Sequence, residues 1–290
     1  MSLESVPPLA SRMKLENGQS IPAIFIGLYL TTAEETTQVV QWALEAGYRG
    51  VDSAQYYKNE AEAGKAINKF LSSEANISAS HLKREDIFFT SKLEENSDYA
   101  TVKASIKDSV KRSELGYIDL FLLHSPYGGK QARLDSWRAV EDAILDGEVK
   151  AGGVSSFGTK HLEELLASNP RIIPAVNQIE LHPFGQRTKI VNFCTQHGIK
   201  IQCYSPLVHG QRMNHPVLLK ISHKYGCSVA QLLVRWGLQH GYVTLPKSVK
   251  LERIVENGAV GGFAISAEDM EELDSLEEGL LTDWDPTDCP

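Results

Sequence analysis

Three side chains that could take part in proton transfer follow three separate apolar runs of the sequence. Asp52 ends one run, Lys92 follows the next and His124 ends a third. Taken singly, each has an ordinary structural alternative: a helix-capping aspartate, a solvated lysine or a hydrogen-bonded core histidine. Two adjacent tyrosines, Tyr56 and Tyr57, change this balance because they place a proton donor close to Asp52.

The combination is suited to making a tyrosine more acidic. Tyrosine normally titrates near pH 10, too high for an efficient proton donor at neutral pH. A nearby ammonium stabilises the phenolate, and a carboxylate keeps that ammonium charged and oriented. A drop of about two pKa units requires roughly 2.7 kcal/mol, which a close lysine could supply. We therefore expect Lys92 to lower the pKa of a tyrosine and His124 to orient a carbonyl oxygen. Spacing alone does not choose between Tyr56 and Tyr57.

The elements that must position these residues are short apolar strands alternating with longer amphipathic helices. Hydrophobic patterning predicts strands at 23–27, 49–52, 87–91, 118–124, 149–155, 173–179, 199–204 and 242–246. Helical periodicity predicts helices over 100–115, 134–146, 161–167, 188–197 and 229–240. A first helix is predicted to begin with a capping box, Thr32 with Glu35, and to stop at Gly47.

Eight such strand–helix units predict a closed (β/α)8 barrel, which we expect to occupy residues 1–290 as a single domain. Asn17-Gly18, between two short alternating runs, predicts an N-terminal β-hairpin. A doubly wound open sheet is the structural alternative, but the GxGxxG motif that would normally accompany it after the first strand is absent from the sequence. In a barrel of this kind, chemistry takes place at the carboxyl ends of the strands.

Composition narrows the possible partners. The chain has 290 residues, is 42% apolar and carries a formal charge of −8, which argues against nucleic-acid and anionic-membrane partners. Its longest apolar-leaning stretch, 21–30, is about half of what a membrane span needs. The N-terminus lacks the pattern of a secretory signal, and the four cysteines lack metal-site spacing. We expect a cytoplasmic monomer or weak dimer that holds no metal. The proton-transfer residues described above favour a small carbonyl compound as its substrate.

The segment GYRGVDSAQYYKNEAEAGKAI at 47–67 resembles the first signature of the aldo-keto reductase family. The resemblance continues in order through TSK (90–92), YIDLFLLHSP (117–126), GVSSF (153–157), NQIELHP (177–183), YSPL (204–207) and LPKSVKLERIVEN (245–257). It spans nearly the whole chain. The register of the first signature selects Tyr57 rather than Tyr56.

The resemblance implies a barrel that binds a nicotinamide cofactor, usually NADPH, across its rim. Asp52, Tyr57, Lys92 and His124 match the family's catalytic tetrad, in which Tyr57 would protonate the carbonyl oxygen as hydride reaches carbon. The resemblance also implies cofactor contacts at Ser155, Ser156, Gln178, Tyr204, Ser205, Leu207, Lys247, Ser248, Arg253, Glu256 and Asn257. Tyr204 would stack on the nicotinamide.

The matches at Lys247 and Arg253 imply a clamp for the adenosine 2′-phosphate. Hydrogen bonds involving charged groups contribute about 1.5–3 kcal/mol each, so two would favour NADPH over NADH by more than about tenfold. The alternative is that both are solvated bases on a lysine-rich turn.

Departures from the family pattern fall mainly at the substrate end. Leu28 stands where threonine is common, Glu94 where an aromatic is frequent and Ser125 where tryptophan is frequent. These changes predict a wider or more polar substrate pocket. Ser156 replaces a common asparagine, which predicts a weaker carboxamide contact. The short stretch after the last helix predicts that a pocket-closing C-terminal loop is missing or stunted.

These observations predict an NADPH-dependent reductase of aldehydes or ketones. One alternative is a binding or sensing protein that keeps the cofactor site with little turnover. Another is an aldolase-type barrel in which Lys92 forms a Schiff base.

Overall fold

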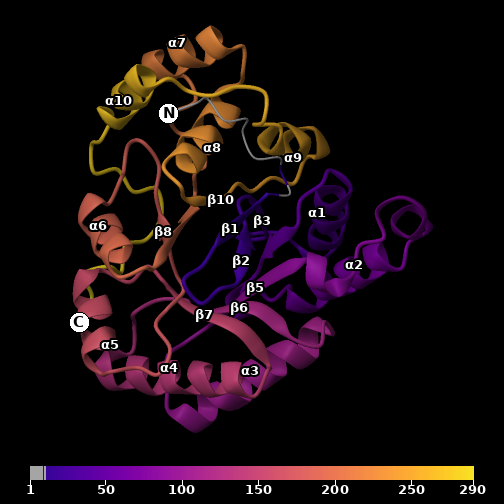
Figure 1. Ribbon diagram of the computed structural model, residues 1–290, viewed down its shortest axis with the longest axis vertical. Coiled ribbons are helices and arrows are strands. Elements are labelled where there is room, and N and C mark those ends of the chain that lie inside the picture. The colour runs from indigo at the N-terminus through magenta and orange to yellow at the C-terminus, as the bar shows by residue number, and fades with distance from the viewer. Residues whose placement is uncertain (1–8, 10) are drawn as a thin grey trace.

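The computed structural model of this protein describes residue 9 and residues 11–290. Parallel strands surrounded by helices form its centre (Figure 1). The barrel strands are β3 (Phe25–Gly27), β4 (Gly50–Asp52), β5 (Phe88–Leu93), β6 (Ile118–Leu123), β7 (Val149–Ser155), β8 (Val176–Glu180), β9 (Lys200–Tyr204) and β10 (Val243–Leu245). The surrounding helices are α1 (Ala33–Glu45), α2 (Glu60–Leu71), α3 (Tyr99–Ser113), α4 (Gly129–Leu145), α5 (Thr159–Ala167), α6 (Thr188–Gln196), α7 (Pro216–Tyr225), α8 (Val229–Gln239), α9 (Leu251–Gly258) and α10 (Ala267–Asp274).

The eight strands pair in sequence order and the sheet closes on itself. Each pair from β3 to β10 is parallel. A parallel bridge between Ile24 and Thr244 joins the first strand to the last, and the Thr244 N–H donates to the carbonyl of Ala23 at 3.0 Å. The predicted (β/α)8 barrel is therefore confirmed.

The largest shift from the predicted strand bounds is in β8, which begins at Val176 rather than at 173. Pro174 lies in the expected strand and lacks the N–H that a central strand must donate. Ile173 is 52% exposed, so it lies outside the sheet as well.

The first helix begins as predicted. The Thr32 hydroxyl accepts from the Glu35 N–H, and the Glu35 carboxylate accepts from the Thr32 N–H at 2.8 Å. Gly47 follows the helix with φ +105°, a conformation that favours glycine. This stop turns the chain directly into β4, which carries Asp52.

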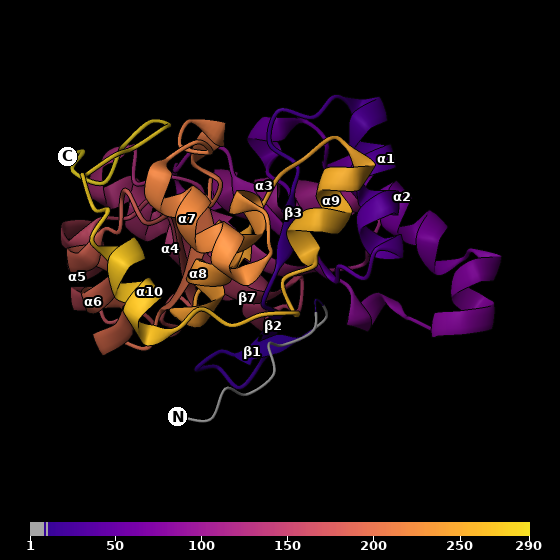
Figure 2. The ribbon, with the colours of Figure 1, turned by 90° about the horizontal axis from the view of Figure 1, so that it is seen from above.

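A hairpin closes the amino-terminal end of the barrel. Strands β1 (Arg12–Lys14) and β2 (Ser20–Pro22) pair antiparallel, as the Asn17-Gly18 signal predicts. Figure 2 shows this hairpin at one end of the molecule, opposite the C-terminal segment. Leu15 and Ile21 of the hairpin join an apolar cluster inside the barrel with Phe25 and Phe88. The hairpin and this apolar cluster fill the amino-terminal end of the barrel, so the opposite end, at the carboxyl ends of the strands, is the one left for polar residues.

None of the helices in residues 11–290 has the length and apolar character needed to cross a membrane. A group of histidine, cysteine or acidic side chains arranged to hold a metal ion is likewise not found among these residues.

Candidate active site

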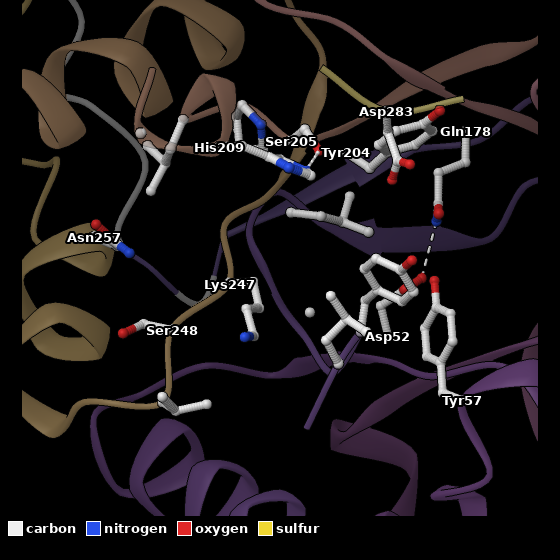
Figure 3. A pocket seen from close by; sticks show the side chains of 18 of the residues that line it. Asp52, Tyr57, Gln178, Tyr204, Ser205, His209, Lys247, Ser248, Asn257 and Asp283 are labelled. Atoms are coloured by element: carbon white, nitrogen blue, oxygen red, sulfur yellow. Dashed lines mark hydrogen bonds between the residues drawn. The ribbon is translucent and has the colours of Figure 1, made fainter. Parts of the chain in front are cut away.

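The carboxyl ends of the barrel strands open into a cavity of about 1170 Å³. Three of the four predicted tetrad residues line it: Asp52, Tyr57 and His124. All the predicted cofactor contacts line it too: Ser155, Ser156, Gln178, Tyr204, Ser205, Leu207, Lys247, Ser248, Arg253, Glu256 and Asn257. The structure therefore gathers residues from well-separated parts of the sequence around one hollow (Figure 3).

Lys92 lies in β5 directly behind the cavity wall. Its side chain is fully buried, and its three ammonium donors point to Asp52 Oδ1 at 2.5 Å, the Ser53 carbonyl at 2.9 Å and Tyr57 Oη at 3.2 Å. An ammonium with all three donors in use is held as a fixed charge. The same arrangement disfavours a Schiff-base role, which needs a free amine open to the substrate.

Tyr57 reaches Lys92 because of the turn that follows β4. Residues Gln55–Tyr57 form a single 3-10 turn that ends at Lys58, with φ +57°. The turn directs the Tyr57 hydroxyl inward, whereas Tyr56 is 60% exposed. Of the two tyrosines, Tyr57 is the one that contacts Lys92, in agreement with the register of the signature.

The expected lowering of the tyrosine pKa is not what the geometry produces. Burial, followed by the charge of Asp52, raises the pKa of Tyr57 well above 10. Burial also lowers the pKa of Lys92, and the attraction of Asp52 opposes this. Desolvation of the phenolate is thus the largest cause of the shift in the pKa of Tyr57. Tyr57 is consequently a neutral phenol at physiological pH, the form that can give up a proton.

His124 is held neutral. Burial, assisted by the charge of Lys92, lowers the pKa of its imidazole from 6.5 to about 3. Its ring lies edge-on to Tyr57, with centroids 5.6 Å apart. A neutral imidazole beside a phenol can hold a carbonyl oxygen by a hydrogen bond without competing for the transferred proton.

Gln178 of β8 links Asp52 of the tetrad to Gln202 of β9. Its Nε2 donates to Asp52 Oδ2 at 2.9 Å and to Gln202 Oε1 at 3.0 Å, and Figure 3 shows the first of these bonds. Both amide hydrogens are used, so Oε1 is the atom of this side chain left to accept from a ligand. The bond to Asp52 also fixes the carboxylate that orients Lys92.

Ser156 and Tyr204 shape the wall beside Gln178. Ser156 has φ +55°, and its N–H donates to the Gln178 carbonyl at 2.8 Å. Its hydroxyl is 3.5 Å from the Tyr204 hydroxyl. Asparagine adopts this left-handed conformation more readily than serine does, so the backbone at this position does not favour the departure at Ser156.

The other end of the cavity is basic. Lys247 follows β10, and Arg253 lies in the first turns of α9. In Figure 3, Lys247, Ser248 and Asn257 lie on the side away from Tyr57. This separation places cations at one end of the hollow and the phenol at the other.

Comparisons with known proteins show which family the chain resembles. The sequence matches the profile of the Aldo/keto reductase family over residues 24–278. The chain belongs to the aldo/keto reductase family. Its members are oxidoreductases.

An uncharacterized oxidoreductase of Schizosaccharomyces pombe is 48% identical over 282 residues, covering 97% of this chain and 99% of the relative. The glyoxal reductase of Bacillus subtilis is 40% identical over 272 residues, covering 93% of this chain and 94% of the relative. The crystal structure of an aldo-keto reductase from a Medee basin deep-sea metagenome superposes with a TM-score of 0.88 at 33% identity, covering 97% of this chain and 100% of the other.

The substrate end of this aldo/keto reductase differs from expectation at one position. Leu28 is fully buried in the core between strands and helices and does not line the cavity, so its placement in the substrate pocket is corrected. Its neighbour Tyr29 lines the cavity instead, because successive side chains near a strand end point to opposite sides. Glu94 and Ser125 line the cavity as predicted.

Sequence reasoning missed the C-terminal tail of this reductase. The tail, residues 275–290, reaches the cavity, where Asp283 and Trp284 line the wall. The expectation of a missing or stunted loop did not include this contribution of the tail to the cavity wall. The tail follows the last helix rather than a strand, so inspection of strand ends could not find it.

A second missed residue is His209. It lies four residues after Ser205 in a turn of the loop after β9, and its Nε2 is 2.8 Å from the Ser205 hydroxyl (Figure 3). Ser205, Val208 and His209 all have positive φ. The YSPL motif ends at 207, before this histidine, and therefore gave no signal for it.

Proposed function

We propose that this protein reduces the carbonyl group of an aldehyde or ketone with NADPH, and that Tyr57 is the proton donor. The observation that carries the proposal is the contact between Lys92 Nζ and Tyr57 Oη at the wall of a cavity whose other end is basic. The coarser statement, an aldo/keto reductase, rests on the family match.

The residues around the cavity suit a nicotinamide dinucleotide phosphate. Lys247 and Arg253 could hold the 2′-phosphate, with Ser248 beside them and Glu256 and Asn257 near the adenine. Nearer the tetrad, the Tyr204 ring offers a stacking surface. The hydroxyls of Ser155 and Ser156 and Gln178 Oε1 could bind a carboxamide. When bound, NADPH supplies the hydride.

Tyr57 supplies the proton. Lys92 donates to the phenolic oxygen, which leaves the Tyr57 O–H free to point toward a substrate oxygen. As that proton leaves, negative charge develops on Oη, and the adjacent ammonium stabilises it. Asp52 keeps the ammonium charged, and the neutral His124 holds the substrate oxygen.

The experiment is to mix the purified protein with NADPH and a panel of aldehydes, 2-oxo esters and diketones and to follow the loss of NADPH absorbance. Glyoxal is the first member of the panel because a relative is named for its reduction. We expect turnover of one or more of these compounds. Tight NADPH binding without turnover of any of them would favour the sensing alternative.

A further inference from the structure

The C-terminal tail is fixed over the substrate end of the cavity. The buried carboxylate of Glu180 accepts from the N–H of Thr282 at 2.7 Å and from the N–H of Asp283 at 3.2 Å. Further along, Asp285 pairs with Arg187 at 2.8 Å. These bonds hold the tail at Thr282, Asp283 and Asp285. The position of Asp283 is therefore fixed by the contacts of the tail and not by its own side chain.

Two glycines let the tail approach closely. A Cβ at Gly185 would lie 2.1 Å from the carbonyl oxygen of Leu280, and one at Gly158 would lie 2.1 Å from that of Thr287. Neither glycine has a positive φ, so close approach, and not backbone conformation, explains them. The tail is thus docked into the barrel rim.

The tail completes an aromatic wall. Trp284 stacks on Tyr127, with ring centroids 5.7 Å apart and planes at 22°. Tyr56 and Tyr29 also line this end, and the Tyr29 ring lies 5.1 Å from that of Tyr57. Trp284 is 38% exposed and Tyr127 53% exposed, so both rings are accessible to a ligand.

Asp283 adds a negative charge that has no ion-pair partner among residues 11–290, since Arg187, whose charge also reaches Tyr204, pairs with Asp285. Two other carboxylates at this end are paired, Asp52 with Lys92 and Glu94 with Lys58. Within the described residues Asp283 takes part in no ion pair, and its Oδ1 accepts from the Trp284 N–H at 2.9 Å. The lysines and the arginine that line the cavity belong to the basic end, at Lys247, Lys250 and Arg253.

The field of this carboxylate reaches the reacting phenol. After burial, the charge of Asp283 is among the causes that raise the pKa of three phenols: Tyr29, Tyr57 and Tyr204. Figure 3 shows the Asp283 carboxylate beside Tyr204, at the same end of the hollow as Tyr57.

We propose that Asp283 and the aromatic wall select carbonyl compounds that carry an ammonium-type cation and disfavour those that carry a carboxylate. Aromatic faces attract quaternary ammonium groups, and an unpaired carboxylate adds a direct attraction. An anionic substrate would meet the same carboxylate as a repulsion. This inference rests on the proposed carbonyl reduction, because it names the substrate class for that site.

The test uses three benzaldehydes of one frame, with a para trimethylammonium, nitro or carboxylate group. In wild type we expect kcat/KM to be highest for the cation and lowest for the anion. Asp283→Asn keeps the Oδ1 acceptor for Trp284 and should lower the cation-to-anion ratio about tenfold, the change that 1.4 kcal/mol gives. Asp288→Asn is the matched control, because it removes a charge from an exposed tail position that does not line the cavity. The cation-to-anion ratio of kcat/KM in Asp288→Asn should equal that of wild type.

A second measurement separates this inference from the proposed function. Dissociation constants of the same three aldehydes in the presence of NADP+, followed by tryptophan fluorescence, require no turnover. If neither these aldehydes nor the wider panel is reduced but the binding ratio falls in Asp283→Asn, the inference stands and the proposed reduction fails. If the nitro compound is reduced but wild type and Asp283→Asn share one cation-to-anion ratio in both assays, charge selection by Asp283 is overturned.

Discussion

Lys92 Nζ lies 3.2 Å from Tyr57 Oη, and its other two donors are bound to Asp52 and to the Ser53 carbonyl. This saturated ammonium cannot rotate away from the phenol without losing a buried hydrogen bond, which costs about 1–3 kcal/mol. The contact therefore keeps a fixed positive charge where a phenolate would form.

Tyr57→Phe should abolish most turnover while leaving NADPH binding nearly unchanged. The variant removes the proposed proton donor but keeps the ring that packs against Tyr29 and His124. General acid catalysis is worth about 10²–10⁴-fold, so kcat should fall within that range. Steady-state kinetics and fluorescence titration with NADPH measure the two effects. A comparable loss in Tyr56→Phe, with Tyr57→Phe active, would show that the wrong tyrosine was chosen.

Asp52→Asn should destabilise the fold by about 3 kcal/mol, because it leaves the Lys92 charge buried without its counter-ion. Urea unfolding followed by circular dichroism gives the change in the free energy of unfolding. Glu94→Gln is the matched control. The side chains of Glu94 and Lys58 are 37% and 68% exposed, so their ion pair should contribute less than about 1 kcal/mol to stability. Equal losses in the two variants would contradict the importance of burial.

Folding stability should fall as pH drops from about 6.5 towards 3 because of His124. Its pKa is lowered to about 3 in the folded protein, so the unfolded chain binds the extra proton across this window. The contribution is at most about 1.4 kcal/mol per pH unit and is fully present above pH 6.5. His124→Gln should show a shallower slope in urea unfolding measured at several pH values. Equal slopes of stability against pH in wild type and His124→Gln would indicate that the imidazole is more exposed to solvent.

The rate of carbonyl reduction should not show a basic limb near neutrality, because burial raises the pKa of Tyr57 well above 10. The phenol then keeps its proton throughout the range in which the protein is assayed. The measurement is kcat/KM against pH with a neutral aldehyde. A limb near pH 8 would contradict this prediction, and its loss in Lys92→Met would assign it either to Lys92, whose pKa burial lowers, or to a phenol made acidic by that ammonium.

Lys247→Ala and Arg253→Ala should each raise the KM for NADPH about tenfold and leave that for NADH nearly unchanged, since each removes one of the two charged hydrogen bonds proposed for the 2′-phosphate. NADH is the internal control because it lacks that phosphate. Equal effects on both cofactors would indicate contacts with the pyrophosphate or the adenine instead.

Oligomeric state, location in the cell and the extent of a single domain over residues 1–290 stay predictions. The barrel and its rim were accessible from sequence because strand–helix alternation and strand-end residues are local patterns. Lys92 and His124 could be recognised in this way, since each follows an apolar run. Leu28 could not be placed, because one residue of register decides whether a side chain near a strand end faces the core or the cavity.

The sequence by itself determined the barrel, because strand–helix alternation is a local pattern, whereas the choice of Tyr57 and the predicted phosphate clamp rested on the resemblance of residues 47–67 and 245–257 to family signatures. The tertiary structure alone decided the pKa of Tyr57 and the contribution of the tail. Desolvation depends on everything packed around a group, which sequence neighbours do not reveal. The tail reaches the cavity through long-range contacts, the bonds of Glu180 to Thr282 and Asp283 and the close approach at Gly185, and no local pattern encodes that path.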